Sequence, residues 1–268
     1  MFTFRKLTIL FFILLLSLNL IHFIGCRMEW LNGHLCSHTY LYILALFSLY
    51  IGISIFMAFF ISSNFHHSAI CNGITTEKIC ALTFDDGPDL THTETILSIL
   101  KREQLSATFF VIGKDLHGKE ALVREMDSAG HLIGNHSWNH SVWFDLYPGS
   151  RMKQELKDTA KAISDIIGRS PLLFRPPFGV INPILSKVLK KLNYHVIGWN
   201  IRSYDTLHKD PKKTVKRILT KVTPGSIIVL HDYVSTSPQI LELLIAELKL
   251  KQYRVVPLTQ LIHIEAYA

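Results

Sequence analysis

The sequence predicts an α/β fold with a mostly parallel sheet, preceded by two transmembrane helices. Two observations carry this prediction: from Ile79 onward short apolar runs alternate with helical patterns, and the first quarter of the chain holds two long uncharged apolar stretches. With 268 residues the chain can form one folded domain of about 200 residues and a membrane part. We therefore expect a membrane anchor over 1–63, a linker over 64–78 and the folded domain over 79–268.

The two apolar stretches, at 7–24 and 41–61, contain about 18 and 21 residues, and each is long enough to cross a bilayer. Because Arg5 and Lys6 precede the first stretch, it could instead be a cleaved signal. Its length exceeds a typical signal core, and no small-residue cleavage pattern follows it. The sequence therefore predicts two retained helices, a multi-pass membrane protein and the lipid bilayer as a partner.

The charges next to the spans bear on orientation. Two spans return the chain to its starting side, so the folded domain lies on the same face as the N-terminus. Arg5 and Lys6 outweigh the single Arg27 of the connecting loop, which favours a cytoplasmic N-terminus. The cysteines leave the compartment open, because either sequence-adjacent pair could be bridged or free. These pairs are Cys26 with Cys36 and Cys71 with Cys80.

The strands of the folded domain are predicted from short apolar runs bounded by turn residues. They are expected at 79–84, 107–112, 131–134, 171–174, 194–201, 226–230 and 253–258. All candidate functional residues described below follow such runs. In barrels of parallel strands the carboxyl ends of the strands carry the chemistry, so this placement is typical of an active site.

The helices between these strands are predicted from caps and apolar spacing. Thr91 and Glu94 resemble a capping box that opens a helix running to about residue 104. A second helix begins at Ser150, carries apolar residues at helical spacing and is closed by Gly168. The pairs 182–183 and 210–211 each combine a capping side chain with proline at the first helical position.

Two adjacent carboxylates, Asp85 and Asp86, end the first predicted strand and precede Gly87-Pro88. Neighbouring side chains on a strand point to opposite faces, and a Gly-Pro turn just after them can aim both toward one cleft. One carboxylate could then hold a metal while the other acts as a base, which metal-assisted hydrolysis requires. A turn whose Asp residues only cap the next helix is the alternative.

His136 and His140 are four positions apart, so a helical or turn-like backbone places both imidazoles on one side. With one Asp they form a three-ligand site that leaves coordination positions open, as a catalytic metal site does. Histidines at this spacing are also common on surface helices, and the paired carboxylates favour the metal site. Non-haem iron oxygenases use the same ligand set, but normally on an all-β scaffold, which the strand-helix alternation contradicts.

Two further segments complete the set of candidate residues. Arg175 follows an apolar run in a loop stiffened by two prolines, where its guanidinium could pair with a carboxylate. His231 ends a buried-looking strand, which is a suitable place for a general acid.

Taken in order, Thr-Phe-Asp-Asp-Gly-Pro, His-x-x-x-His, Arg-Pro-Pro-x-Gly and a late strand ending in His resemble the polysaccharide deacetylase family. This is the nodulation-type (NodB homology) deacetylase domain of carbohydrate esterase family four. The resemblance covers about residues 75 to 262 and implies an irregular (β/α) barrel of about seven strands. It also implies a metal-dependent hydrolase that removes the N-acetyl group of an amino-sugar glycan, such as peptidoglycan or chitin-like oligomers, outside the cytoplasm.

Residue by residue, the resemblance implies that Asp85 is the general base. It implies three ligands for a divalent metal, most often zinc: Asp86, His136 and His140. Arg175 would orient and tune Asp85.

The remaining roles come from the same resemblance. The backbone N–H of Phe178 would stabilise the oxyanion, and His231, oriented by Asp205, would protonate the leaving amine. The family's fourth motif resembles Asp-x-x-Asp-Trp, whereas this chain has Arg202-Ser-Tyr-Asp-Thr206. That Trp lines the pocket for the acyl methyl in the family, so acyl preference and pocket shape are not predicted here.

Two alternative functions stay open. A deacylase or deformylase of a lipid-linked amino sugar is expected if the domain faces the cytoplasm. A catalytically impaired glycan-binding membrane protein is permitted by Arg202 and Thr206, but it leaves the intact catalytic motifs without an explanation. The net charge of +7 does not predict a nucleic-acid partner, because the basic run at 209–221 lacks interleaved aromatics. No protein partner is predicted.

Overall fold

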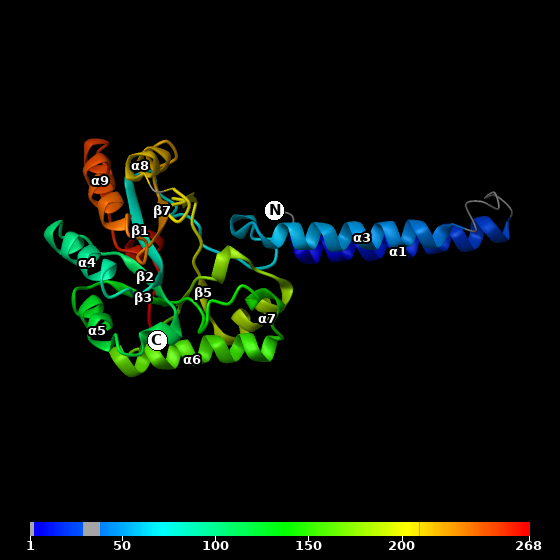
Figure 1. Cartoon of the computed structure of the whole chain (residues 1–268). Helices are drawn as coiled ribbons and strands as arrows, with labels where there is room; N and C mark the ends of the chain where they lie inside the picture. Colours follow the sequence, from blue (N-terminus) through cyan, green and yellow to red (C-terminus); the bar gives the residue numbers. More distant parts are fainter. Residues whose placement is uncertain (1–2, 29–37, 209) are drawn as a thin grey trace.

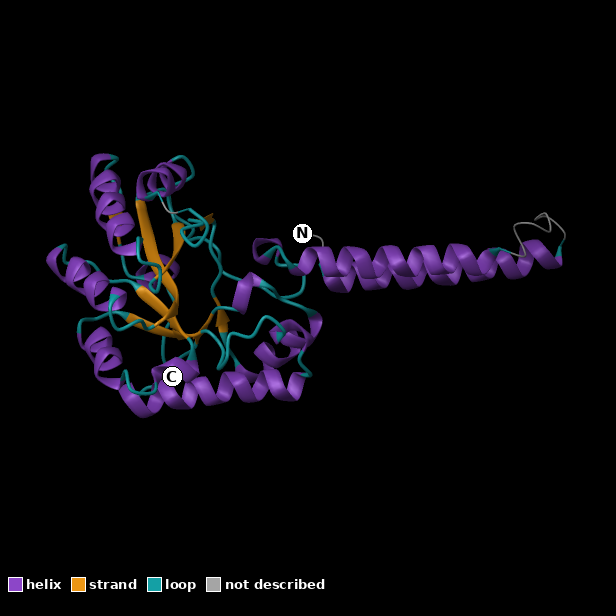
Figure 2. Cartoon of the chain, in the orientation of Figure 1, coloured by secondary structure: helices purple, strands orange, loops and turns teal. Residues whose placement is uncertain are grey.

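The computed structural model describes residues 3–28, 38–208 and 210–268, which form a helical hairpin and an α/β domain (Figure 1). The hairpin consists of α1 (Phe4–Arg27) and α3 (Thr39–Ala58), which lie side by side and project away from the domain (Figures 1 and 2). Contacts between the two helices include the Thr8 and Tyr50 hydroxyls at 3.1 Å and stacked rings of Phe11 and Tyr50 at 4.6 Å.

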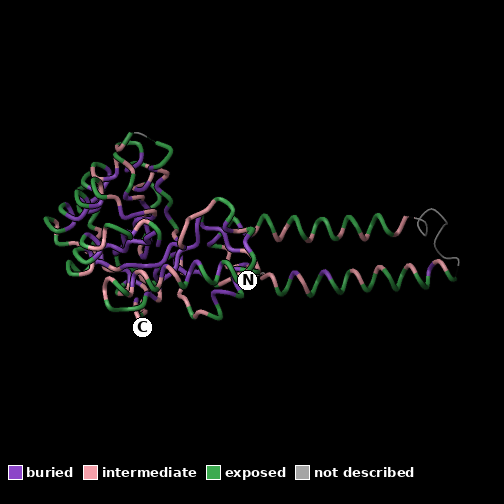
Figure 3. Tube along the Cα trace, turned by 60° about the horizontal axis from the view of Figure 1, so that its bottom comes forward, coloured by how far each residue is buried: buried purple, intermediate pink, exposed green. Residues whose placement is uncertain are grey.

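Most of the large apolar residues of the hairpin are exposed, and little of its trace is coloured as buried (Figure 3). Only 11% of the most apolar window of α1 and 6% of that of α3 is buried. A core helix of a soluble protein would be largely buried, so these two helices are candidate membrane spans. A helix near the N-terminus with this composition also fits a signal sequence.

The named strands of the domain pair in parallel, and the sheet curls into an incomplete barrel with helices outside it (Figure 2). The strands are β1 (Ile79–Gly87), β2 (Thr108–Val111), β3 (Leu132–Asn135), β4 (Leu173–Phe174), β5 (His195–Val196), β6 (Ile201–Arg202), β7 (Ser226–His231) and β8 (Arg254–Val255). Their order is β5-β4-β3-β2-β1-β7-β6, and β8 pairs with β1. The predicted fold class, an irregular α/β barrel, is confirmed.

The single strand predicted over 194–201 is wrong. It divides into β5 and β6, which lie at the two edges of the sheet. In the segment between β5 and β6, the carbonyls of Ile197 and Gly198 accept hydrogen bonds from the Arg175 guanidinium at 3.2 and 3.0 Å. The chain therefore leaves the ladder at this point and crosses from one edge of the sheet to the other.

The helices outside the sheet are α4 (His92–Arg102), α5 (Glu120–Ser128), α6 (Gly149–Ile167), α7 (Pro183–Leu192), α8 (Pro211–Leu219), α9 (Ser237–Leu250) and α10 (Leu258–Ile262). The predicted caps of α7 and α8 are confirmed: the Asn182 side chain accepts from Leu185 N, and Asp210 accepts from Lys212 N. Gly168 closes α6 with φ 73°, as predicted.

The predicted capping box of α4 is wrong. The Thr91 side chain caps no backbone N–H of the helix. Instead Asp89 Oδ1 accepts from the backbone N–H groups of Thr91 and His92 at 3.0 and 2.8 Å. Asp89 performs the same job two residues earlier, which a pattern of spacing alone does not distinguish from the predicted box.

The basic run lies on α8. Lys212 and Lys216 are exposed, while Val215 and Ile218 are buried against the domain. Lys209, the first residue of the run, lies outside the described residues. The lysines thus form the solvated face of an amphipathic helix.

Alternation along β1 separates the core from the interior of the barrel. Leu82 and Phe84 pack into the cluster that the outer helices α4, α5 and α9 share with the sheet. Ala81 belongs to a second cluster inside the barrel, and Thr83 and Asp85 follow it on the same side at the period of two. On the inward face of β1, an apolar residue in the interior of the barrel is therefore followed by polar residues toward the carboxyl end of the strand.

Residues 64–78, expected as a linker, pack against the domain and form two isolated β-bridges with it. Ile70 forms a parallel bridge with Ile197, and Asn72 an antiparallel one with Ser226. Cys71, within this segment, and Cys80, just after it, are both buried and free.

Different packing explains why these two thiols are not bridged. Cys80 points into the cluster between sheet and outer helices, and Cys71 into the cluster around α6 and α7. Cys36 of the other pair lies outside the described residues.

Candidate active site

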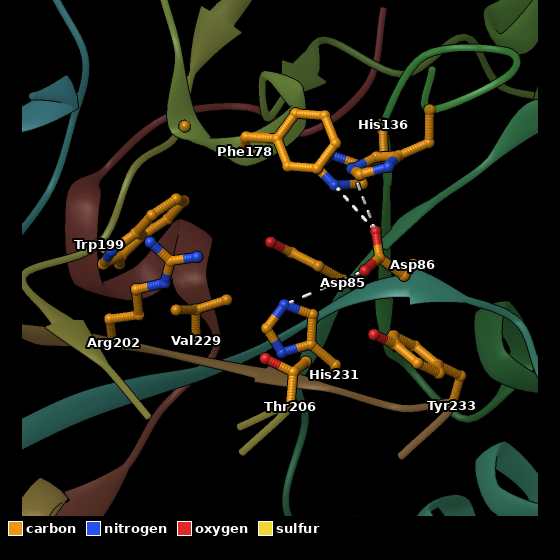
Figure 4. Close-up of a pocket in the computed structure, with 12 residues that line it drawn as sticks. Asp85, Asp86, His136, Phe178, Trp199, Arg202, Thr206, Val229, His231 and Tyr233 are labelled. Atoms are coloured by element: carbon orange, nitrogen blue, oxygen red, sulfur yellow. Dashed lines mark ion pairs between the residues drawn. The ribbon is translucent and has the colours of Figure 1, made fainter. Parts of the chain in front are cut away.

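A cavity of about 220 Å³ opens at the carboxyl ends of the strands (Figure 4). Its lining brings together side chains from loops that are far apart in the sequence. They are Asp85, Asp86, His136, His140, Phe178, Gly179, Trp199, Arg202, Thr206, Val229, His231 and Tyr233. Six of the eight predicted site residues line this cavity, and Arg175 and Asp205 lie buried directly behind it.

A β-bulge in β1 aims both carboxylates into the cavity. The register with β2 shifts between Asp85 and Gly87, and Asp86 has the left-handed φ of 72°. Neighbouring strand residues would otherwise point to opposite faces. The sequence prediction assigned this reorientation to the Gly-Pro turn after the strand, whereas the structure places it at Asp86 itself.

Asp86, His136 and His140 form a cluster that fits a metal ion. Asp86 Oδ1 lies 3.3 Å from Nε2 of each imidazole, and the three ligand atoms are within 4.8 Å of one another. This carboxylate oxygen is buried and has no hydrogen-bond partner in the described structure. A buried oxygen between two imidazole nitrogens is costly unless a cation satisfies it, and one oxygen with two nitrogens is a donor set that suits zinc.

The side chains of the cluster shift one another's pKa. His136 Nδ1 donates to the carbonyl of Arg175 at 2.8 Å, so Nε2 is the ring nitrogen that faces Asp86. Burial opposes the charged ring of His136, but Asp85 and Asp86 outweigh it and raise the pKa of His136. Burial lowers the pKa of His140 to about 4, so its ring is neutral at pH 7. Burial alone would raise the pKa of Asp86, but the adjacent His136 outweighs it and holds the pKa below the usual range.

The loop that carries His140 is held by Glu155, a residue that the sequence analysis missed. Its carboxylate accepts from the backbone N–H of Trp138 at 3.1 Å and from the backbone N–H and side chain of Asn139, both at 2.9 Å. Glu155 lies on the buried face of α6 and is 5% exposed. A charged residue among the apolar positions of that helix was the available signal.

Asp85 is held by Arg175. The Arg175 Nη1 donates to Asp85 Oδ1 at 2.6 Å and to Thr83 Oγ1 at 2.8 Å. Arg175 is fully buried and its guanidinium lies over the Phe110 ring at 4.1 Å. Asp85 thus faces the same cavity as the cluster of Asp86, His136 and His140 without belonging to it.

His231 and Asp205 form a second pair on the opposite wall. His231 Nδ1 lies 2.8 Å from Asp205 Oδ1, and Asp205 Oδ2 accepts from the His231 backbone N–H at 2.8 Å. Burial opposes the charged imidazole, but its hydrogen bond and ion pair with Asp205 outweigh this and raise the pKa of His231. His231 Nε2 points into the cavity, 4.0 Å from Asp86 Oδ2.

The remaining lining residues divide into predicted and missed ones. Phe178 has a left-handed φ of 57°, and its half-exposed ring packs against His140 at 4.7 Å. Such a backbone conformation is rare for a bulky residue and is often found at functional sites. Trp199 and Tyr233 were missed, because no spacing links them to the motifs. Arg202 lies beside Trp199 and Val229, and Thr206 lies beside His231 (Figure 4).

Comparison with known proteins gives the same family throughout. A family model of polysaccharide deacetylases matches residues 72–197. A peptidoglycan-N-acetylglucosamine deacetylase of Bacillus cereus is 33% identical over 69% of this chain and 89% of its own length. A deacetylase of Listeria monocytogenes with the same specificity in its name is also 33% identical, over 69% of this chain but 39% of its own. The chain therefore spans less than half of that larger relative.

Solved structures show the same fold. A chitin deacetylase of the fungus Colletotrichum lindemuthianum has a TM-score of 0.70 and 25% identity, over 75% of this chain and 95% of its own. A carbohydrate esterase family four pseudoenzyme of Bacillus anthracis has a TM-score of 0.68 and 25% identity, over 72% of this chain and 68% of its own. Since the fold occurs with and without activity, the residues of the cavity have to carry the functional argument.

Proposed function

Because this chain belongs to the polysaccharide deacetylase family, hydrolases of carbon–nitrogen bonds other than peptide bonds, we propose that it removes the N-acetyl group from an amino-sugar glycan of the peptidoglycan class. The observation that carries the proposal is the pairing of two adjacent carboxylates with different surroundings. Asp86 lies between two imidazole nitrogens at 3.3 Å, whereas Asp85 faces the same cavity and is held by Arg175.

The proposed metal ligands are Asp86, His136 and His140, and zinc is the proposed metal. The bound cation would act as a Lewis acid on the acyl carbonyl and would lower the pKa of a coordinated water. The three protein ligands leave room for both in the cavity. The buried, unpartnered Asp86 Oδ1 supports a resident cation at this place.

Asp85 is the proposed general base. Its Oδ1 is occupied by the Arg175 guanidinium, so the proton of the attacking water goes to the other oxygen. The fixed ion pair prevents the carboxylate from turning toward the metal ligands. The backbone N–H of Phe178, at the rim of the same cavity, is the proposed donor to the oxyanion.

His231 is the proposed general acid for the leaving nitrogen. Asp205 binds both its backbone N–H and its Nδ1, which fixes the ring and leaves Nε2 free to donate into the cavity. Asp205 is 2% exposed and also accepts from the Ser203 hydroxyl at 2.8 Å. Its orientation is therefore fixed before substrate binds, as an efficient proton donor requires.

We further propose that the α1–α3 hairpin anchors the domain in the membrane with the cavity on the extracytoplasmic side. The outward-facing apolar side chains of the hairpin support the anchor. The peptidoglycan named in the relatives' descriptions supports the side. If the domain faced the cytoplasm, as Arg5 and Lys6 favour, the substrate would be a lipid-linked amino sugar.

A direct test measures acetate release from N-acetylglucosamine oligomers and from peptidoglycan. We expect turnover that a chelator abolishes and added Zn²⁺ restores. Asp85→Asn should lower kcat about 10²–10⁴-fold, because it removes the general base, while the bound metal measured by elemental analysis stays at wild-type level. His136→Ala should lose both the turnover and the bound metal.

The matched control is Asp165→Asn, the same chemical change at an exposed site on α6. It should retain wild-type turnover. Acetate release that persists in metal-free protein would refute the assigned roles. A full complement of metal without turnover on any acylated amino sugar would favour a glycan-binding protein instead.

A further inference from the structure

The cavity is lined by a positively charged side chain, Arg202, that has no role in the proposed reaction. Arg202 lines its wall and is exposed, and no described acidic side chain forms an ion pair with it. The other arginine of the site, Arg175, is fully buried and paired with Asp85 at 2.6 Å. Arg202 therefore brings an uncompensated positive charge to the place where substrate binds.

The guanidinium of Arg202 is held in a defined position. It lies over the ring of Tyr204 at 5.1 Å and over that of Trp199 at 5.9 Å. Its backbone is fixed in β6, where Arg202 pairs with Val229, another lining residue. Figure 4 shows the side chain beside Trp199 with the guanidinium turned toward the interior of the cavity. Aromatic faces orient the planar group without neutralising its charge.

Small side chains line the cavity between Arg202 and His231. Val229 lies beside Arg202, and Thr206 lies beside His231 (Figure 4). Thr206 stands at the position of the tryptophan in the fourth motif of the family. A threonine side chain fills far less volume than a tryptophan side chain. The part of the cavity between the guanidinium and His231 can therefore accept a substituent of the sugar in addition to its acyl group.

We propose that Arg202 binds an anionic substituent on a carbon next to the acylated one, so that anionic amino sugars are the preferred substrates. This inference rests on the proposed deacetylase function. In a 2-acylamino sugar the neighbouring carbons are C1 and C3, and an anion there is a C1 phosphate or the carboxylate of a C3 ether. Both present two oxygens that match the fork of a guanidinium.

The test compares kcat/KM of the full-length protein on three substrates. They are a neutral N-acetylglucosamine oligomer, an oligomer that contains the 3-O-lactyl ether (N-acetylmuramic acid), and N-acetylglucosamine 1-phosphate. In the wild type we expect a ratio of anionic to neutral kcat/KM above one. Arg202→Gln should lower this ratio about ten- to a hundredfold, mainly through KM, since it removes a charge-assisted hydrogen-bonded pair. Arg202→Lys should retain part of the ratio.

The matched control is Arg217→Gln. Arg217 lies over the same Tyr204 ring at 4.2 Å and donates to the Arg202 carbonyl, but it does not line the cavity. It should keep the wild-type ratio, which separates direct contact from a general effect of charge. Thermal unfolding of each variant identifies a folding defect. If Arg202→Gln has such a defect, the ratio of anionic to neutral kcat/KM in Arg202→Lys decides the test.

The outcomes are distinct. A ratio that falls for the lactyl ether alone, or for the phosphate alone, supports the proposal and identifies the anion. An active wild type without preference, or equal losses on neutral and anionic substrates in Arg202→Gln, overturns it. No acetate from any of the three substrates overturns the proposed function itself.

Discussion

Arg175 connects more parts of the site than any other single side chain described above. Its guanidinium donates to Asp85, to the Thr83 hydroxyl and to the carbonyls of Ile197 and Gly198. A buried charge is tolerated only when it is paired and its donors are satisfied. The five donors of arginine in a rigid fork can reach these four oxygens, which a lysine ammonium cannot.

Arg175→Lys should therefore impair both activity and stability. We expect a loss of at least about a hundredfold in kcat/KM, because Asp85 loses its fixed orientation, and a decrease of about 3 kcal/mol in the free energy of unfolding. Acetate release and denaturant titration measure the two effects. Arg254→Lys, at an exposed pair with Glu77, is the control and should change neither. Wild-type stability in Arg175→Lys would contradict the structural role.

We expect His131 to give the stability of the protein a pH dependence that does not involve Asp86, His136 or His140. The Ala107 N–H donates to His131 Nδ1 at 3.2 Å, while Nε2 is buried without a partner in the described structure. Burial lowers the pKa of His131 to about 4. In the unfolded chain this histidine has a pKa of about 6.5 and binds a proton that it does not bind in the folded state. The free energy of unfolding therefore falls as the pH decreases from about 6.5 to about 4.

His131→Asn should remove this component, since the Asn oxygen can still accept from Ala107 N–H but does not titrate. The wild type should lose on the order of 2 kcal/mol of unfolding free energy over that pH range relative to the variant. Denaturant titrations at a series of pH values measure the difference. His117→Asn, at a 98% exposed side chain, should keep the wild-type profile. Parallel profiles for wild type and His131→Asn would refute the assignment.

At the scale of elements, β1 holds the two adjacent carboxylates of the site. Asp85 pairs with Phe110 of β2 and with His231 of β7, so one residue of the central strand fixes base and acid relative to each other. The bulge that follows then reorients Asp86. The end of β7 approaches β1 closely at this point. Gly87 permits the approach because it has no side chain that would meet Asp232.

Gly87→Ala tests the bulge. A Cβ at this position would lie 1.9 Å from Asp232 Oδ2, a carboxylate fixed by the Thr93 hydroxyl at 2.6 Å. We expect a loss of about 2–3 kcal/mol in unfolding free energy and a strong loss of acetate release, because β1 or β7 has to shift. Gly149→Ala, whose Cβ would meet Ile184 at 3.3 Å, is the control and should cost far less. Full activity in Gly87→Ala would contradict the close packing.

At the scale of the whole molecule, the hairpin is joined to the domain at its base. Phe4 N donates to the Phe65 carbonyl at 2.8 Å and Ile181 N to the Ala58 carbonyl at 3.0 Å. Helices of 24 and 20 residues extend about 36 and 30 Å, which matches the apolar thickness of a bilayer. If the hairpin spans the membrane, the domain and the start of α1 lie on the same face.

This topology makes a prediction for intact cells. The full chain should stay in the membrane fraction after carbonate extraction, and protease added outside should remove both the domain and an N-terminal tag. A cleaved first segment would appear instead as a mature protein without the tag. Protection of the domain until the cells are opened would contradict the extracytoplasmic side and favour a lipid-linked substrate.

Much of the fold follows from local patterns. The strand-helix alternation, the Asn182 and Asp210 caps and the Gly168 stop each depend on residues a few positions apart, and the structure shows them where the sequence predicts them. The eight predicted site residues also converge at one end of the sheet, although their roles stay predictions. The sequence analysis erred where distant atoms compete for a backbone, as Arg175 does at residues 197–198.

The sequence by itself determined the family, the α/β class and the residue types available for the chemistry, because these depend on composition, periodicity and motif order. Only the tertiary structure decided how these groups face one another: the bulge at Asp86, the Glu155 support of the His140 loop, and Arg202 on the cavity wall. Such relations join segments separated by tens of residues. They depend on packing in three dimensions, which no local spacing encodes.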